Sequence, residues 1–220
     1  KIGLNLIKKN KKIALINGPV SKKHFLTKKY LGVTEYISKK IKSKNQVMLI
    51  YNDKLSVSPL TTHLPLKHVA KNITKEKIIS NVKEIRKFYE NLLKKKPKIA
   101  ILGLNPHCET IDKISEEKKI IIPAIKYLKK INLNTDGPFP ADTFFLKKNI
   151  NKYDVVVGMY HDQVLAPIKT LYNFNAINIT LGLPFIRISP DHGPNNKMLG
   201  KNKSDPSSIF CAMRFINKIR

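Results

Sequence analysis

Short apolar runs bounded by polar residues are the feature that most constrains the fold of this chain. VMLIYN (residues 47–52), KIAILGL (98–104) and VVVGMY (155–160) are continuous apolar runs. A continuous run such as 155–160 is typical of a strand covered on both faces of a parallel sheet. Amphipathic segments with helical periodicity separate these runs, and such alternation indicates a sheet with parallel content. The sequence therefore predicts an α/β protein.

The helices are predicted from periodicity. Over residues 74–94, apolar side chains recur at steps of three and four, which predicts one long amphipathic helix with Thr74 as its N-cap. Further helices are expected over residues 33–42, through 120–128 with Pro123 at a start or a kink, and from Asp205-Pro206, where proline takes the first helical position.

Three less regular features are expected between these elements. KIALIN (12–17) is predicted to be a strand that ends at the Gly18-Pro19 turn. Residues 55–62 are predicted to be extended at a sheet edge, because Pro59 has no N–H to donate to a neighbouring strand. A turn is expected at residues 136–138, Asp-Gly-Pro.

Composition bears on the class of partner. The formal net charge of +27 would suggest nucleic acid, but 38 of the 42 basic residues are lysine. Arginine is preferred for bidentate phosphate and base contacts, and no aromatic residues are interleaved with the scattered lysines. We therefore interpret the lysines as solvated and expect no nucleic-acid partner. No apolar run approaches membrane-spanning length, and Cys108 and Cys211 fit free thiols in a reducing cytoplasm.

A polar set follows the last apolar run. His161-Asp162 would lie at the carboxyl end of that strand, which is where open α/β sheets bind ligands. Lys169, Asn178 and Arg187 come next at intervals of nine residues. Lysine and arginine bind phosphate or carboxylate, and asparagine can bind a hydroxyl group. The stretch predicts a site for an anionic, hydroxylated small molecule.

Several blocks together are similar to one family. MYHDQ (159–163), NITLGLPFIR (178–187) and DHG (191–193) resemble segments of the 4-hydroxythreonine-4-phosphate dehydrogenase family of vitamin B6 biosynthesis. LINGPVSK (15–22), TTHLPL (61–66), GLNPH (103–107) and GPFPADTFF (137–145) occur in that family's order and at close to its spacing. The resemblance runs from about residue 12 to the C-terminus.

The resemblance implies the two-domain α/β architecture of isocitrate and isopropylmalate dehydrogenases, here without the family's N-terminal portion. Residues 1–20 would be a remnant of the cofactor-side domain, 21–164 the metal- and substrate-binding and dimerisation domain, and 165–220 the return to the cofactor-side domain. It also implies a homodimer with its active site at the subunit interface, and we expect the protein to be cytoplasmic.

His63, His107 and His161 are candidate metal ligands. Three imidazoles with an open position are a common catalytic zinc pattern, but these residues lie 44 and 54 positions apart, so unrelated surface or capping histidines are the alternative on spacing alone. The resemblance matches them to the family's metal-binding histidines and implies zinc, magnesium or cobalt. Asp142 and Asp162 are candidate catalytic carboxylates that orient the histidines, although a turn or helix cap would also explain Asp142.

The resemblance also implies substrate and cofactor contacts. No GxGxxG fingerprint is present, so a Rossmann-type cofactor site has no support. Lys169 and Arg187 could otherwise be ordinary surface cations, and the DHG segment an ordinary turn into the last helix. The matched positions are Thr34, Lys169, Asn178 and Arg187 for the substrate, with Lys169 also a catalytic candidate, and His192, Gly193 and Asp205 for NAD or NADP.

The implied reaction is NAD-dependent, metal-assisted oxidation of 4-phosphooxy-threonine at its 3-hydroxyl, followed by decarboxylation to 3-amino-2-oxopropyl phosphate. Two departures from the family bear on this expectation. Val33 stands where the family has a histidine before the threonine matched by Thr34, and one residue fewer follows His107. The alternatives are a related dehydrogenase of a phosphorylated threonate or sugar acid and, from another class, a metal-dependent hydrolase.

Overall fold

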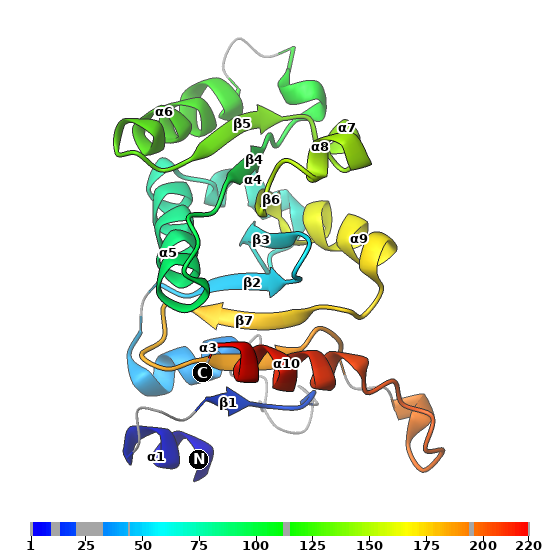
Figure 1. Cartoon of the computed structure of the whole chain (residues 1–220). Coiled ribbons are helices and arrows are strands. Elements are labelled where there is room, and N and C mark those ends of the chain that lie inside the picture. The colour runs from blue at the N-terminus through cyan, green and yellow to red at the C-terminus, as the bar shows by residue number, and fades with distance from the viewer. Residues whose placement is uncertain are drawn as a thin grey trace. The chain divides into compact units, whose positions relative to one another are not determined.

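The chain forms two compact units (Figure 1). The computed structural model describes residues 2–9, 14–20, 33–43, 45–111, 115–193 and 196–219. The terminal unit combines Lys1–Gln46 with Tyr172–Arg220, and the central unit is Val47–Leu171. Their limits differ from the predicted domains 1–20, 21–164 and 165–220. Compactness does not test where a cofactor-side and a substrate-side domain meet, so those domain boundaries stay a prediction.

The central unit is built on a mixed sheet with the strand order β2-β3-β6-β4-β5. The bounds are β2 Val47–Tyr51, β3 Ser56–Thr61, β4 Ile99–Leu102, β5 Thr135–Phe139 and β6 Val155–Tyr160. β3, β6, β4 and β5 run parallel, whereas β2 is antiparallel to β3. Every residue of β4 is buried, as a continuous apolar run requires. The three apolar runs are confirmed as strands.

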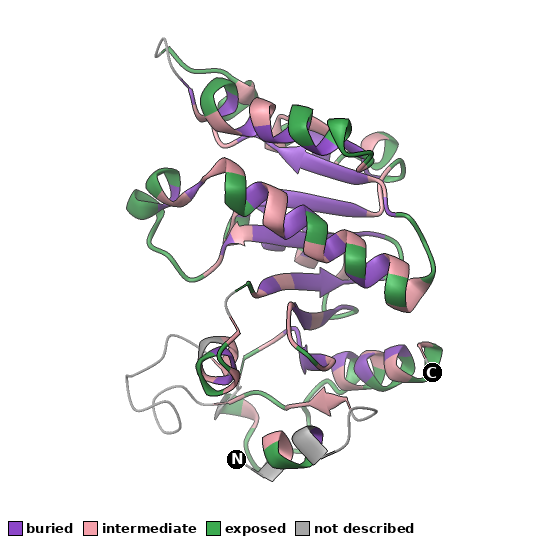
Figure 2. Cartoon of the chain, turned by 90° about the vertical axis from the view of Figure 1, so that its left-hand side faces the viewer, coloured by how far each residue is buried: buried purple, intermediate pink, exposed green. Residues whose placement is uncertain are grey.

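Helices flank this sheet. α5 (Lys75–Leu93) and α6 (Ile122–Lys130) pack on each other, and Figure 2 shows their exposed residues in front of the buried strands. Thr74 caps α5 as predicted, because its side-chain oxygen accepts the N–H of Lys77 at 3.2 Å. Pro123 lies at the start of α6. The remaining helical segments are η1 Leu66–His68, α4 Val69–Asn72, η2 Pro106–Cys108, the π-helical η3 Glu117–Ile121, α7 Ala141–Phe144, α8 Lys147–Ile150 and α9 His161–Tyr172.

Two predictions for the central sheet are wrong. The Pro59 strand is not at an edge of the sheet, because β3 pairs with both β2 and β6. The N–H of Ser56 points to β6, where it donates to Asp154 O, so alternation turns the nitrogen of Pro59 toward β2 and no bond to β6 is lost. The turn expected at 136–138 is part of β5, which shifts its register against β4 there.

The terminal unit contains a small sheet in the order β1-β8-β7, with β1 parallel and β7 antiparallel to β8. α10 packs against β7 and β8 and buries Ala212 and Phe215. Of the strand predicted at 12–17, Leu15–Ile16 is confirmed, and residues 12 and 13 lie outside the described residues. The bounds are α1 Ile2–Lys9, β1 Leu15–Ile16, α3 Val33–Ile41, β7 Ile177–Leu181, β8 Arg187–Pro190, η4 Asn196–Met198 and α10 Ser207–Lys218.

No helix in the described ranges combines the length and the apolar character that a membrane crossing requires.

Candidate active site

The three candidate histidines follow three neighbouring parallel strands. His63 comes two residues after β3, His161 directly after β6, and His107 in η2 beyond β4. These strands are adjacent in the order β3-β6-β4, so their carboxyl ends lie along one edge of the sheet. Asp142, in the first turn of α7, follows β5 at the same edge. Four candidates that are distant in sequence therefore share the edge at which α/β sheets bind ligands.

The side chains at this edge approach each other in pairs. The ring centroids of His63 and His161 are 6.0 Å apart. Nδ1 of His107 lies 3.8 Å from Oδ2 of Asp142. Within the ranges that the structure describes, no three His, Cys, Asp or Glu side chains come close enough to enclose a metal ion. The donor types at this edge thus fit a metal such as zinc, while a closed ligand set is not formed.

Each of two histidines has a carboxylate next to Nδ1. Oδ1 of Asp162 lies 2.6 Å from Nδ1 of His161, and Asp142 takes the same place beside His107 at the longer distance. A carboxylate at Nδ1 favours the tautomer with its proton there, which leaves Nε2 with a lone pair. The pairing agrees with the orienting role predicted for both aspartates, and that role stays a prediction.

Side-chain hydrogen bonds connect the carboxyl ends of these strands. Thr61 donates its hydroxyl proton to Met159 O at 2.7 Å and so joins β3 to β6. Gln163 accepts the N–H of Met159 at 2.7 Å and donates to Gly103 O at 2.7 Å, which joins β6 to the residue after β4. Gln163 is 8% exposed. It lies in the MYHDQ block, and no function was predicted for it from the sequence.

Glu117 is the second residue that sequence analysis missed, and nothing in its surroundings in the sequence marks it. Its side chain accepts the N–H groups of Leu104 and Asn105, each at 2.8 Å, and the side-chain amide of Asn105 at 2.9 Å. Desolvation alone would raise the pKa of Glu117, but the hydrogen bonds, chiefly those from Asn105, outweigh it and hold the pKa below its ordinary value. Desolvation, and then the Glu117 carboxylate, raise the pKa of the Cys108 thiol.

In the terminal unit, Arg187 and Thr34 are brought together. The guanidinium of Arg187 donates to Asn17 Oδ1 at 2.8 Å, to Thr180 Oγ1 at 2.9 Å and to Thr34 Oγ1 at 3.3 Å. Arg187 is 3% exposed, which is not the situation of an ordinary surface cation. Its planar donor fork reaches acceptors from three other segments of the chain.

Asn178 shares this polar face. Thr180 pairs with Arg187 and Asn178 with Ser189 across β7 and β8, and directly paired residues point to the same face of a sheet. Asn178, Thr180, Arg187 and Ser189 therefore line one face. Lys169 is on α9, in the central unit with the histidines, so the predicted substrate residues are distributed over both units.

The predicted cofactor residues lie around the start of α10. The ring of His192 meets that of Phe174 edge-on, with centroids 5.9 Å apart. Oδ1 of Asp205 accepts the N–H of Ser207. A hydrogen bond from the Ser207 side chain first, then this backbone bond, and last the attraction of His192 lower the pKa of Asp205. Among the described residues, no atom lies within 4 Å of a Cβ atom built on Gly193. Residues 194 and 195 lie outside the described residues.

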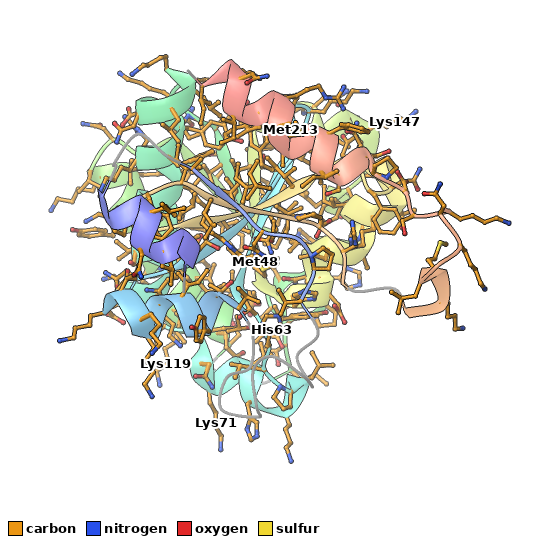
Figure 3. All side chains as sticks on the ribbon, turned by 90° about the horizontal axis from the view of Figure 1, so that it is seen from below. Met48, His63, Lys71, Lys119, Lys147 and Met213 are labelled. Carbon is orange, nitrogen blue, oxygen red and sulfur yellow. The ribbon has the colours of Figure 1, made fainter. Side chains whose placement is uncertain are left out.

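Lysine side chains project outward. Figure 3 shows the side chains of Lys71 and Lys119 extending from the ribbon, and both residues are exposed. This agrees with their interpretation as solvated residues.

The sheet topology and the polar residues at the carboxyl ends of its parallel strands indicate a class of α/β protein. Isocitrate dehydrogenase from Methylococcus capsulatus has the same fold, with a TM-score of 0.59 at 11% identity over 100% of this chain and 71% of that one. This confirms the predicted α/β dehydrogenase-type architecture. A profile of the family described as pyridoxal phosphate biosynthetic protein PdxA matches residues 1–216, and the chain belongs to this family.

Individual relatives support the same membership. The chain is 47% identical to 4-hydroxythreonine-4-phosphate dehydrogenase of Sulfurihydrogenibium sp. (strain YO3AOP1), over 91% of this chain and 63% of the relative. The crystal structure of the protein of that name from Klebsiella pneumoniae gives a TM-score of 0.82 at 30% identity, over 98% of this chain and 67% of that one. The chain thus spans less than two thirds of the length of that curated relative.

Proposed function

We propose that this chain is part of a dehydrogenase that oxidises 4-phosphooxy-threonine at its 3-hydroxyl with NAD or NADP and then releases CO2, which yields 3-amino-2-oxopropyl phosphate. The observation that supports the proposal most is the placement of His63, His161 and His107 at the carboxyl ends of three adjacent parallel strands. Family membership supports the substrate class, because relatives carry the name of this activity.

His63, His107 and His161 would hold a divalent metal through their imidazole nitrogens. When bound, such an ion supplies Lewis-acid chemistry: it lowers the pKa of a hydroxyl group and stabilises developing negative charge on oxygen. Asp162, by its contact at Nδ1 of His161, would keep Nε2 directed to the ligand position. Asp142 would do the same for His107.

The other candidate residues would bind, orient and move protons. Lys169 and Arg187 would hold the phosphate and carboxylate of the substrate, and Thr34 and Asn178 its hydroxyl or amino group. Lys169, Asp142 or Asp162 would take the proton of the 3-hydroxyl as the hydride leaves C3 for the nicotinamide ring. His192, Gly193 and Asp205 would contact the adenosine end of the cofactor. We further propose that the active protein is a homodimer.

The decisive measurements are metal content and NAD reduction. Purified protein should contain close to one zinc or cobalt per chain, and His161→Ala should lose it, whereas His68→Ala, at an exposed histidine of η1 in the same unit, should keep it. Absorbance of NADH should rise when 4-phosphooxy-threonine is added. Phosphate or another product released without NAD reduction would favour a metal-dependent hydrolase instead.

A related dehydrogenase is the second candidate. Val33, which starts α3 directly before Thr34, has no side-chain group to hydrogen-bond a substrate, whereas the resembled family has a histidine there. The loss of one polar contact would favour a substrate without the amino group, such as a phosphorylated threonate or sugar acid. A higher kcat/KM on 4-phosphothreonate than on 4-phosphooxy-threonine would establish this alternative.

A further inference from the structure

The segment Gly103–Asn105, which leads from β4 to His107, is held from two sides by buried side chains. On one side, Gln163 donates to Gly103 O at 2.7 Å while it accepts the N–H of Met159. On the other, Glu117 accepts the N–H groups of Leu104 and Asn105, each at 2.8 Å. Neither side chain belongs to the sets of residues assigned above to metal, substrate or cofactor.

The two holding residues are almost inaccessible. Gln163 is 8% exposed and Glu117 only 1% exposed. A buried amide or carboxylate is expensive unless its hydrogen-bonding groups are satisfied, and here both are satisfied by the same short segment and its neighbours. Their burial therefore requires the backbone at residues 103–105 to stay where it is.

Glycines allow this close packing. A Cβ on Gly158 would lie 2.4 Å from Val164 Cγ1 and 3.0 Å from Gln163 Oε1. A Cβ on Gly103 would lie 2.6 Å from Cys108 Sγ and 3.2 Å from Glu117 Oε1. Any larger residue at either position would displace one of the holding side chains or its neighbours, so the strand ends and the two side chains fit as one assembly.

The backbone beyond this segment is strained. His107 has φ of 56° and Cys108 has φ of 61°, in the left-handed region that non-glycine residues rarely occupy. Strain of this kind persists only where the surroundings impose it. The hydrogen bonds of Glu117 and Gln163 act on the residues immediately before it, so they are the groups placed to impose it.

We infer that Gln163 and Glu117 are positioning residues that fix the backbones of His107 and His161 relative to each other, so that the imidazoles need only side-chain rotation to bind one metal ion. Gln163 lies two residues after His161 and bonds to the segment that carries His107, and thus couples the two histidines directly. The inference rests on the proposed metal-dependent function. A site whose backbone is already placed loses less conformational entropy on binding, and outer-shell residues of metal sites change affinity by about 10–100-fold.

The test uses Gln163→Glu and Glu117→Gln, which keep side-chain size. The first replaces the donor to Gly103 O by a carboxylate oxygen. The second leaves one oxygen for the N–H groups of Leu104 and Asn105, turns an NH2 toward the side-chain amide of Asn105 and removes the negative charge that all three bonds share. Asn81→Asp is the matched control. Asn81 belongs to α5, is 5% exposed, and forms a hydrogen bond with the side chain of Ser58 on β3. Metal-free protein is titrated with Co2+ against a competing chelator, and the visible spectrum of bound Co2+ and the thermal midpoint are recorded.

We expect both site variants to bind Co2+ about 10–100-fold more weakly than the wild type, with an altered absorption band that reports changed ligand geometry. Asn81→Asp should lower the thermal midpoint at least as much and leave affinity and spectrum unchanged, which separates positioning from general destabilisation. Wild-type affinity and spectrum in both site variants would overturn the inference and leave the proposed function intact. A well-folded wild type that binds no Co2+ would overturn the proposed function and the inference with it.

Discussion

Asp162 illustrates how a single exposed carboxylate can matter for a site without contributing much to the fold. Its side chain is 84% exposed, so the surrounding protein contributes little to holding it in place. Its contact with Nδ1 of His161 is nevertheless short, at 2.6 Å. Because the tautomer of His161 decides which nitrogen can bind a metal, the effect of Asp162 should appear in metal binding rather than in stability.

Asp162→Asn is therefore expected to weaken Zn2+ or Co2+ binding by about 10–100-fold and to change the free energy of unfolding by no more than about 0.5 kcal/mol. Chelator competition gives the first quantity and urea denaturation the second. Asp53→Asn, at an exposed aspartate of the same unit that bonds to Tyr51, should leave metal affinity unchanged. Equal metal affinity in Asp162→Asn and the wild type would show that the carboxylate does not select the tautomer.

Arg187 presents the opposite case, since a predicted substrate ligand is also a buried structural group. Arg187→Lys should reduce the free energy of unfolding by about 2–3 kcal/mol, because one ammonium group cannot reach Asn17, Thr34 and Thr180 together and hydrogen bonds to charged groups contribute about 1.5–3 kcal/mol each. Arg214→Lys, at an exposed position of α10, is the control in urea denaturation. If Arg187→Lys lost substrate binding but kept the stability of the wild type, the hydrogen bonds of Arg187 to Asn17, Thr34 and Thr180 would not stabilise the fold.

At the scale of elements, α5 offers a test of a prediction made from local sequence. Thr74→Ala should lower the free energy of unfolding by about 1 kcal/mol, because the N–H of Lys77 loses its acceptor at the start of the helix. Thr74→Ser keeps a hydroxyl group and should restore most of the difference. Urea denaturation of the three proteins measures it, and equal stability of Thr74→Ala and the wild type would mean that water replaces the cap fully.

The elements that sequence analysis predicted correctly are those that local patterns determine. Helix α5 follows from periodicity and its cap, and β6 from a continuous apolar run. The two wrong predictions, for the Pro59 strand and for residues 136–138, depend on neighbouring strands that a local sequence pattern does not identify. Pro59 lies inside the sheet, between β2 and β6, although it cannot donate to β2. Gly137 was assigned to a turn, but in β5 it lets the backbone of β4 approach, since a Cβ there would lie 2.3 Å from Ile101 O.

In the candidate site, too, some features follow from the sequence and others depend on the tertiary fold. His63, His107 and His161 share an edge because β3, β6 and β4 are parallel neighbours in the sheet, which spacing in the sequence could not reveal. The family resemblance identified these three residues as candidates, whereas only the sheet topology shows that they lie at the same edge. Glu117 could not be found from sequence, because its function depends on burial against residues 104 and 105.

Charge at the amino ends of the strands predicts a pH dependence. Desolvation would raise the pKa of Asp136 in β5, but hydrogen bonding and attraction from Lys129, attraction from Lys98 and a hydrogen bond from Tyr153 lower it. A folded-state pKa below the unfolded value means that this stabilisation is complete above the unfolded pKa of about 3.9 and is lost as pH falls through the folded value.

Asp136→Asn should therefore melt at a lower temperature than the wild type at pH 7, and the gap should close as the pH falls below about 4. Lys129→Met should remove part of the same pH dependence, because it deletes the main partner. Melting temperatures recorded across the acid range give the comparison. A gap of constant size down to the lowest pH at which both proteins fold would contradict the assignment.

At the scale of the whole molecule, charge and proposed substrate are matched. A net charge of +27 creates a positive field that attracts a phosphorylated acid over distances longer than any single contact. Such steering accelerates encounter rather than chemistry, and salt screens it, with a Debye length that shortens from about 14 to 6 Å between about 50 and 300 mM ionic strength. The scattered lysines, which we interpret as solvated, would then contribute to function through the electrostatic field that their charges create together.

Raising NaCl over that range should lower kcat/KM for the phosphorylated substrate several-fold and leave kcat nearly unchanged, because the bound complex is already formed when kcat is measured. Initial rates of NADH formation at each salt concentration give both constants, and sucrose at equal osmolality controls for effects of solute on the fold. Glutamate in place of several exposed lysines, such as Lys71 and Lys147, should flatten the salt dependence without changing kcat. A kcat that falls in parallel with kcat/KM would instead assign the salt effect to the active site itself, through ions that compete for its metal or its cations.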